Sequence, residues 1–319
     1  MRFTSTRALA VASAVALFAG ACSGGSGATT APSATSAPSV APSIAASLAP
    51  SAAASASAVA SASSAPSAAA LVAPDRIKAA GKLVFCSDIS YAPEEFYAAD
   101  GTTAQGSDID IATQIAKYWG VPVEIDNTGF DSIILALNAK KCDLVISGMN
   151  DTADREKQVD FVDYLKVGQG LLVPVGNPKG IHTLADLSGK DVAVQLGTTN
   201  LDALNAENVT LKAAGQPQIN IHGYQKDTDA FNQLALGRVD AYSTDSPVVA
   251  YYNSLPGNAG KYEVGGTPID PAPIGIAMRK DDTGMKAAVQ AAIDAMYSDG
   301  SLVAIVAKWG MTNAVVLLK

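Results

Sequence analysis

Short apolar runs alternate with longer amphipathic stretches from about residue 73 onwards, and this pattern predicts alternating strands and helices. Residues 83–86 and 144–146 are predicted to be buried strands, and the alternating apolar positions in 121–125 predict a third. Helices are expected over 108–119 and 133–139, where the apolar spacing is helical. The order of strand, helix, strand, helix and strand predicts right-handed parallel βαβ units.

The second half of the globular region has the same architecture with a different sequence. Its predicted strands span 191–196, 219–224, 241–245 and 272–278, and its predicted helices span 201–207, 227–236, 247–252, 285–297 and 302–309. Gly168 and Gly170 predict a flexible break between the halves. If the C-terminal tail packs back on the first lobe, the hinge has two segments, near 166–170 and 266–272. The predicted fold class is therefore α/β with two lobes, each a mostly parallel sheet flanked by helices, joined by a two-strand hinge.

Several predicted strands end in polar residues, which makes their carboxyl ends a candidate binding site. The clearest case is the strand 144–146, which is followed by Ser147, Gly148, Asn150 and then Arg155. Ligands of open α/β sheets bind at the carboxyl ends of the strands, and the fork of donors on an arginine suits a carboxylate. The alternative is a surface arginine that pairs with a neighbouring acidic residue, Glu156 or Asp154.

The second half offers two further polar strand ends. Gly197, Thr198 and Thr199 stand at a strand-to-helix junction, where exposed backbone N–H groups suit an anion. The alternative there is a plain threonine N-cap. Asp245 ends a later strand and is either the N-cap of the helix that follows or a ligand for a cation.

The composition bounds the class of protein. The chain has 319 residues, of which 48% are hydrophobic, so about two domains with large cores are expected. The formal charge of −8 counts against an electrostatic nucleic-acid binder. Three cysteines and two histidines form no CxxC, HxxxH or HExxH spacing, so no dedicated metal site and no cofactor is predicted.

Cys86 and Cys142 both fall in the first half and are predicted to be separate thiols. In a parallel register that places Leu83 beside Asp143, Cys86 lies several residues beyond Cys142. The offset is roughly 13 Å at the rise of a strand, which is too far for a disulfide.

The N-terminal segment predicts export. Arg2 and Arg7 precede an apolar run of about a dozen residues, which fits the core of a signal peptide over residues 1–21 and is too short to cross a bilayer. The small residues before Cys22 resemble the lipobox of bacterial lipoproteins, in which the cysteine is lipidated, for instance by palmitate. The alternative is an ordinary signal peptide with an incidental cysteine.

Residues 22–72 are almost entirely Ala, Ser, Pro, Gly and Thr and are predicted to be a disordered tether. Such a segment would hold a globular body off the membrane, although tolerated low-complexity sequence is the alternative, and glycosylation is open. The predicted organisation continues with a first lobe of 73–169 plus 273–319 and a second lobe of 170–272.

From Gly81 to Gly310 the chain resembles the family 3 solute-binding proteins that serve polar amino-acid ABC transporters. Five short motifs match in order. They are the loop 88–93, the helix opening 106–112, the stretch from Ser147 to Arg155 followed by 159–161, the strand end 195–199, and the turn 237–240.

The resemblance implies roles for individual residues. Arg155 would grip the α-carboxylate of an amino acid with the help of the backbone of Thr199 and Gly148 and the side chain of Asn150. Asp245 would bind the α-ammonium group. The full implied set of ligand-binding residues is Asp88, Tyr91, Glu94, Phe130, Ser147, Gly148, Met149, Asn150, Arg155, Gln195, Thr198, Thr199 and Asp245.

Within this set Tyr91 and Phe130 would be aromatic walls, and Asp88 would meet the end of a polar or cationic side chain. The sequence departs from the family at Glu94, where relatives commonly have an aromatic residue. A carboxylate there would favour a cationic ligand side chain; the alternative is a loop residue that faces solvent beside Glu95.

The implied function is that of a monomeric, non-enzymatic receptor on the outer face of the cell membrane or in the periplasm. It would clasp a polar, including cationic, amino acid and deliver it to an ABC permease, with a lipid anchor as its link to the membrane. One alternative is an enzyme on the same fold, such as a cyclohexadienyl or arogenate dehydratase. Another is a sensor subunit, which would usually carry a transmembrane and signalling segment, whereas this chain ends at Lys319.

Overall fold

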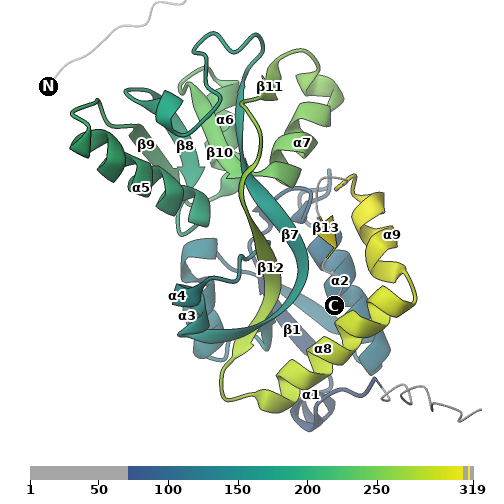
Figure 1. Cartoon of the computed structure of the whole chain (residues 1–319). Helices are drawn as coiled ribbons and strands as arrows, with labels where there is room; N and C mark the ends of the chain where they lie inside the picture. The colour runs from purple at the N-terminus through teal and green to yellow at the C-terminus, as the bar shows by residue number, and fades with distance from the viewer. Residues whose placement is uncertain (1–70, 312–314, 317–319) are drawn as a thin grey trace, which may run out of the picture. The chain divides into compact units, whose positions relative to one another are not determined.

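The computed structural model describes residues 71–311 and 315–316. The predicted signal peptide, Cys22 and nearly all of the predicted tether lie outside the described residues. The described part is α/β, as predicted, with two groups of elements joined by long strands (Figure 1). Hydrophobic clusters on both sides of the joining strands form separate cores, so the two groups are called lobe 1 and lobe 2 below.

Lobe 1 is built on three parallel strands. The central strand β1 (Leu83–Ser87) pairs with β5 (Val123–Asn127) on one side and β6 (Leu144–Val145) on the other. The helices that flank them are α1 (Asp75–Ala80), α2 (Ser107–Trp119), α3 (Ile133–Asn138) and α4 (Ala153–Glu156). A small antiparallel sheet of β2 (Ser90–Tyr91), β3 (Glu95–Tyr97) and β4 (Ala104–Gln105) follows β1. Both loops after β1 and β6 thus leave the same edge of the sheet.

Lobe 2 repeats this arrangement. Its central strand β8 (Asp191–Gln195) pairs in parallel with β9 (Asn220–Tyr224) and β10 (Ala241–Asp245). Its helices are α5 (Thr199–Ala213), α6 (Asp227–Ala235) and α7 (Ser246–Ser254), and the short strand β11 (Tyr262–Val264) lies at its edge. The carboxyl ends of these strands, and the starts of the helices that follow them, therefore lie at one edge of the sheet, as they do in lobe 1.

The lobes are joined by β7 (Val159–Pro174) and β12 (Ile269–Arg279), which pair with each other and cross between the two groups (Figure 1). The break predicted at 168–170 is absent, because β7 is one continuous strand there. The predicted two-segment hinge near 166–170 and 266–272 does coincide with the β7–β12 pair, in which Gln169 lies beside Ile269. The glycines serve close packing instead. A Cβ on Gly168 would stand 2.8 Å from the Cβ of Pro268, and one on Gly170 would stand 3.0 Å from Val249.

The C-terminal helices α8 (Thr283–Ser298) and α9 (Ser301–Lys308) pack on lobe 1. Met285, Ile293 and Leu302 share one hydrophobic core with Leu83 and Ile115. The last described strand, β13 (Val315–Val316), pairs with β7.

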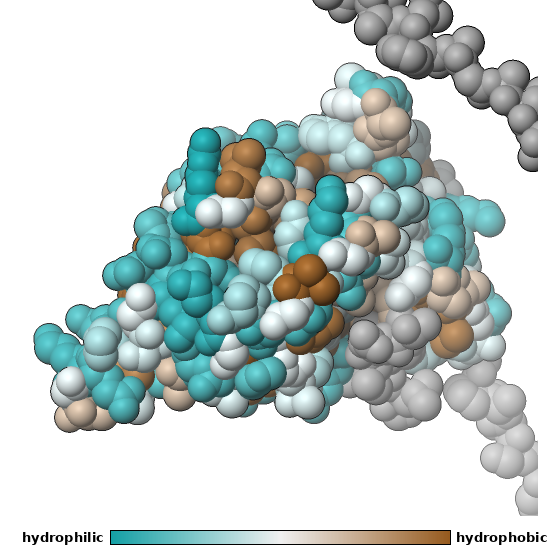
Figure 2. Space-filling model, turned by 90° about the horizontal axis from the view of Figure 1, so that it is seen from above, coloured by the Kyte–Doolittle hydropathy of each residue, from teal (hydrophilic) through white to brown (hydrophobic). Residues whose placement is uncertain are grey.

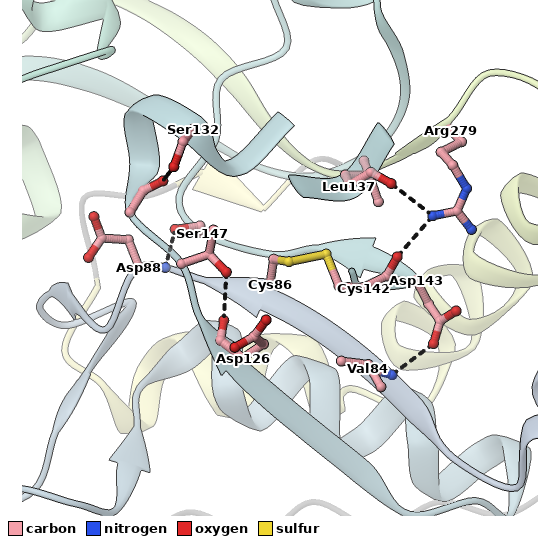
Figure 3. The surroundings of a disulfide bond; sticks show 12 residues. Val84, Cys86, Asp88, Asp126, Ser132, Leu137, Cys142, Asp143, Ser147 and Arg279 are labelled. Carbon is pink, nitrogen blue, oxygen red and sulfur yellow. Dashed lines mark hydrogen bonds between the residues drawn. A yellow bond between two sulfur atoms is a disulfide. The ribbon is translucent and has the colours of Figure 1, made fainter. Parts of the chain in front are cut away.

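Cys86 and Cys142 form a disulfide, with their Cα atoms 5.7 Å apart, so the prediction of two separate thiols is wrong (Figure 3). The expected register was close, because Asp143 lies beside Val84 and donates its backbone N–H to the Val84 carbonyl at 2.8 Å. The error was to extend the strand back to Cys142. That residue precedes β6 and is not paired with β1, and it packs in one core cluster with Cys86 and with Ile133 and Leu137 of α3.

The surface seen from above lobe 2 carries its hydrophobic residues in separate small groups between hydrophilic ones (Figure 2). The most exposed large apolar side chains, Leu135, Val209 and Leu236, come from different elements. None of the described helices is both long and apolar enough to cross a membrane.

Candidate ligand site between the two lobes

One cavity between the lobes is lined by almost all of the predicted site residues. Only Glu94 and Met149 of the predicted set do not line it, and one residue that was not in the set, Asn200, does. The lining residues are Asp88, Tyr91, Phe130, Ser147, Gly148, Asn150, Arg155, Gln195, Thr198, Thr199, Asn200 and Asp245. They come from the carboxyl ends of strands and the starts of helices in both lobes, which is why residues so far apart in sequence meet.

Side chains nearly fill this cavity, whose volume is about 10 Å³. Four contacts close it across the lobes. The hydroxyl of Thr199 donates to Asn150 Oδ1 at 2.8 Å, and the side chain of Gln195 donates to Asp88 at 2.7 Å. The guanidinium of Arg155 donates to the Gly197 carbonyl at 3.0 Å. The backbone N–H of Asp227 donates to the hydroxyl of Ser90 at 3.1 Å. A ligand of amino-acid size would therefore enter only when the lobes move apart about the β7–β12 pair.

The loop after β6 is held from below by buried polar groups. Ser147 accepts from the backbone N–H of Asp88 at 3.0 Å and donates to Glu95 at 2.7 Å. The backbone N–H of Gly148 donates to Asp108 at 2.8 Å. A Cβ on Gly148 would stand 2.8 Å from the ring of Tyr91, so only glycine allows this close approach. The loop is therefore fixed before any ligand arrives.

Arg155 reaches the cavity from α4 and carries its main positive charge. Its guanidinium donates to the carbonyl of Asn150 at 2.8 Å and lies 5.3 Å from the centre of the Phe130 ring. Burial lowers the pKa of Arg155, while the charges of Asp202 and Asp245 raise it. The alternative of an ion pair with Glu156 or Asp154 is wrong, because the Asp154 carboxylate pairs with Lys157 and the guanidinium turns inward.

Asp245 carries the negative charge on the opposite lobe. It stands at the N-cap position of α7, yet its side chain makes no capping hydrogen bond. Instead its carboxylate accepts from the side chain of Asn200 at 3.0 Å. Burial raises the pKa of Asp245, and hydrogen bonds from Asn200 and Tyr91, together with the charge of Arg155, lower it.

Asn200 is the residue that sequence reasoning missed. Because a carboxylate only accepts, the amide must turn its Nδ2 toward Asp245. Its Oδ1 is then buried and has no hydrogen-bond partner within the described residues. The signal was present in the sequence, since Asn200 directly follows the two threonines at the start of α5.

Of the two roles that the sequence left open at this junction, the structure contains the N-cap, and the binding of an anion stays a prediction. Thr198 is the N-cap of α5, and its hydroxyl accepts from the backbone N–H of Leu201 at 3.2 Å. Thr199 is the first residue of the helix and turns its hydroxyl toward Asn150 of the other lobe.

Asp88 is buried at the end of β1 and lies at the boundary between the lobes. Burial raises its pKa, and hydrogen bonds from Ser90, Phe130 and Gln195 lower it. Its Oδ2 accepts from the backbone N–H of Phe130 at 3.1 Å. Tyr91 is buried as well and packs with the core of lobe 2, so its ring is one wall of the cavity.

Glu94 and Met149 lie behind the cavity rather than on it. Met149 belongs to the core beneath α3. The alternative of a solvent-facing Glu94 is wrong, since only 1% of this residue is exposed and Oε2 has no hydrogen-bond partner among the described residues. Burial, with the charges of Asp108 and Asp245, raises the pKa of Glu94 well above its ordinary value.

A buried carboxyl of lobe 2, Asp227, leads to a prediction about pH. Burial raises its pKa to about 8, and it accepts hydrogen bonds from Tyr242 and Thr244. A carboxyl whose pKa is higher in the folded chain than in the unfolded one stabilises the fold at low pH, and this contribution is lost as the pH rises toward the folded value. We therefore expect the melting temperature to fall between about pH 5 and pH 8.

The variant Asp227→Asn keeps a neutral hydrogen-bond acceptor at this position. It should show a shallower fall of the melting temperature over the same pH range. The fall should not vanish, because burial also raises the pKa of Asp108, to about 6. Equal slopes for the variant and the wild type would contradict the assignment.

Comparison with known proteins agrees with this geometry. Residues 83–312 match the model of the bacterial extracellular solute-binding proteins, family 3. The L-cystine-binding protein TcyJ of Escherichia coli K12 is 30% identical over 236 residues, which are 74% of this chain and 85% of that protein.

Two solved structures are also similar. An ancestral arginine-binding protein bound to arginine has a TM-score of 0.66 and 37% identity, over 72% of this chain and 98% of that one. The ancestral amino acid-binding protein AncCDT-1, a precursor of cyclohexadienyl dehydratase, has a TM-score of 0.66 and 36% identity, over 74% and 98%. The chain belongs to the bacterial extracellular solute-binding proteins of family 3.

Proposed function

We propose that this protein binds an α-amino acid between its lobes and delivers it to the permease of an ABC transporter. The observation that carries the proposal is the pairing of Arg155 on lobe 1 with Asp245 on lobe 2 around one cavity. A zwitterion needs one cationic and one anionic partner. Since only the closed arrangement presents both partners at once, ligand binding would favour closure.

The α-carboxylate would lie against the guanidinium of Arg155 and the first N–H groups of α5, which begins at Thr199. The α-ammonium group would lie between the carboxylate of Asp245 and the free Oδ1 of Asn200. Similar proteins are named for binding cystine, arginine and histidine, which supports an amino acid as the ligand.

The side chain of the ligand would run between Phe130 and Tyr91 toward Asp88. Asp88 is a buried carboxyl group at that end of the cavity, and it favours a ligand whose side chain ends in a cation. Glu94 does not line the cavity, and its raised pKa favours the neutral form, so this preference depends on Asp88. We therefore propose a polar amino acid with a cationic end.

We further propose that the protein is not an enzyme. The similar curated proteins are named for binding. One similar solved structure is a binding protein described as a precursor of cyclohexadienyl dehydratase, so an enzyme is related to this fold. We expect no turnover of prephenate or arogenate. The proposal extends to export and to lipid anchoring at Cys22, with the chain acting as a monomer.

A binding screen tests the proposed ligand class. The full chain is heated with each of the twenty amino acids, ornithine, citrulline and small amines, and the melting temperature is recorded. A ligand present at about 100 times its Kd should stabilise the fold by about 2.7 kcal/mol. We expect arginine, lysine or ornithine to raise the melting temperature while matched amines that lack the α-carboxylate do not. A screen in which no amino acid raises it would contradict the proposal.

A further inference from the structure

A second and larger cavity lies directly beside the candidate site. Its volume is about 340 Å³, and Asp88 lines both cavities. Lobe 1 contributes Phe96 and Asn127 to its walls, and lobe 2 contributes Lys226, Thr228 and Tyr251. Asp88 thus stands between the two cavities, and a ligand that replaces the Gln195–Asp88 hydrogen bond and extends past Asp88 would reach the second cavity.

The charges along the two cavities repeat. The first cavity offers a cation, Arg155, and an anion, Asp245. The second offers a cation, Lys226, beside the anion Asp88, and the charge of Lys226 acts on that carboxyl group. Each cavity thus carries the pair of opposite charges that a zwitterion requires, with the two pairs arranged along one cleft.

Lys226 is available for a ligand. Its side chain is exposed, and it forms no ion pair with a carboxylate among the described residues. It directly precedes α6, a nine-residue helix whose start at Asp227 and Thr228 faces the lobe boundary. The positive end of the helix dipole adds to the charge of the lysine and favours a carboxylate there.

The walls of the second cavity offer aromatic surface to the apolar atoms of a ligand. The rings of Phe96 and Tyr251 come from different lobes, and their centres are 5.4 Å apart. Tyr251 in turn meets Tyr252, with 5.6 Å between the ring centres. Methylene groups and sulfur atoms both pack well against such rings.

We propose that the Asp88–Lys226 pair is a second zwitterion site, and that the cleft accepts a diamino dicarboxylic acid, an amino acid whose side chain ends in another α-amino acid group. The first amino acid group lies at Arg155 and Asp245, so the inference rests on the proposed function. The second places its ammonium group at Asp88 and its carboxylate at Lys226. A ligand with a cationic end and no distal carboxylate satisfies Asp88 but leaves Lys226 unpaired.

Calorimetry on the full chain with a matched pair of ligands tests this. L,L-2,6-diaminopimelate and L-lysine differ only by the distal carboxylate, and L-cystine supplies a second double zwitterion. For the wild type we expect diaminopimelate and cystine to bind more tightly than lysine. The variant Lys226→Gln should weaken both by about 3- to 10-fold, the range of a carboxylate pair that is partly open to water. It should leave lysine within about 2-fold.

Lys212→Gln is the matched control, because Lys212 is an exposed lysine of the same lobe at the far end of α5. It should change none of the three affinities. Equal effects of Lys226→Gln on diaminopimelate and lysine, or no effect on either, would overturn the second site. If lysine binds and the double zwitterions do not, this inference fails and the proposed function stands; if no amino acid binds, both fail.

Discussion

Arg155→Ala should abolish measurable amino-acid binding while the fold persists. The guanidinium is the main cation of the cavity, and it lies on the opposite side of the lobe boundary from the carboxylate of Asp245. Removing one partner of a desolvated charge pair costs about 2–5 kcal/mol, which corresponds to roughly 30- to several-thousand-fold in Kd. Calorimetry with the best ligand of the screen measures the loss, and a melting curve checks the fold.

Two variants separate the charge of Arg155 from its shape. Arg155→Lys keeps the positive charge but replaces the planar fork, so it should recover only part of the affinity. Arg238→Ala removes an exposed arginine whose side chain donates to Gln233 at 3.3 Å, and it should bind like the wild type. Binding by Arg155→Ala within about 2-fold of the wild type would show that the carboxylate lies elsewhere.

Asp245→Asn tests the other half of the clasp. The substitution keeps the size of the side chain and can still accept from Asn200, but it removes the negative charge that faces the α-ammonium group. It should weaken binding strongly while leaving the start of α7 intact, because Asp245 makes no side-chain capping bond. The two substitutions together should lose less than the sum of the single losses, since both groups bind one ligand.

The polar ends of strands were predictable from the sequence because parallel strands place their carboxyl ends on one edge. This is why Asp88 could be expected near Ser147, and Thr199 near Asp245. That the two pairs share one site between the lobes was implied only by the family resemblance. The pattern of apolar runs also predicted the order of strands and helices, since burial on both faces leaves continuous apolar stretches. What the sequence could not supply was the direction in which side chains point after a strand ends.

That missing information explains the failures. Glu94 looks like a loop residue by sequence, yet the small sheet after β1 turns it into the interior. Gly168 and Gly170 predict flexibility, yet they allow close approach within a continuous strand. The glycines approach Pro268 and Val249, and the carbonyl of Glu94 accepts from the backbone N–H of Asp108 at 2.9 Å. No local pattern encodes these contacts, because the partners are distant in sequence.

Removal of the disulfide should cost much of the stability of lobe 1. Cys86 and Cys142 are separated by 56 residues, and both are buried. A cross-link over such a loop restricts the unfolded chain and stabilises the fold by roughly 4 kcal/mol in the chain-entropy model. The double variant Cys86→Ala and Cys142→Ala should therefore unfold at a clearly lower urea concentration than the oxidised wild type.

Because of its position, the bridge also supports two segments that line the binding site, so its removal should lower ligand affinity as well as stability. Cys86 stands two residues before Asp88, and Cys142 lies just ahead of β6, which ends at the loop that holds Ser147 (Figure 3). The hydrogen bond between the backbone N–H of Asp88 and Ser147 joins these two segments beyond the bridge. Since that bond remains, ligand affinity should fall less than stability does. A reducing agent should shift the unfolding midpoint of the wild type toward that of the double variant, and it should leave the midpoint of the variant unchanged. If the oxidised wild type and the variant unfold at the same midpoint, the bridge contributes no stability.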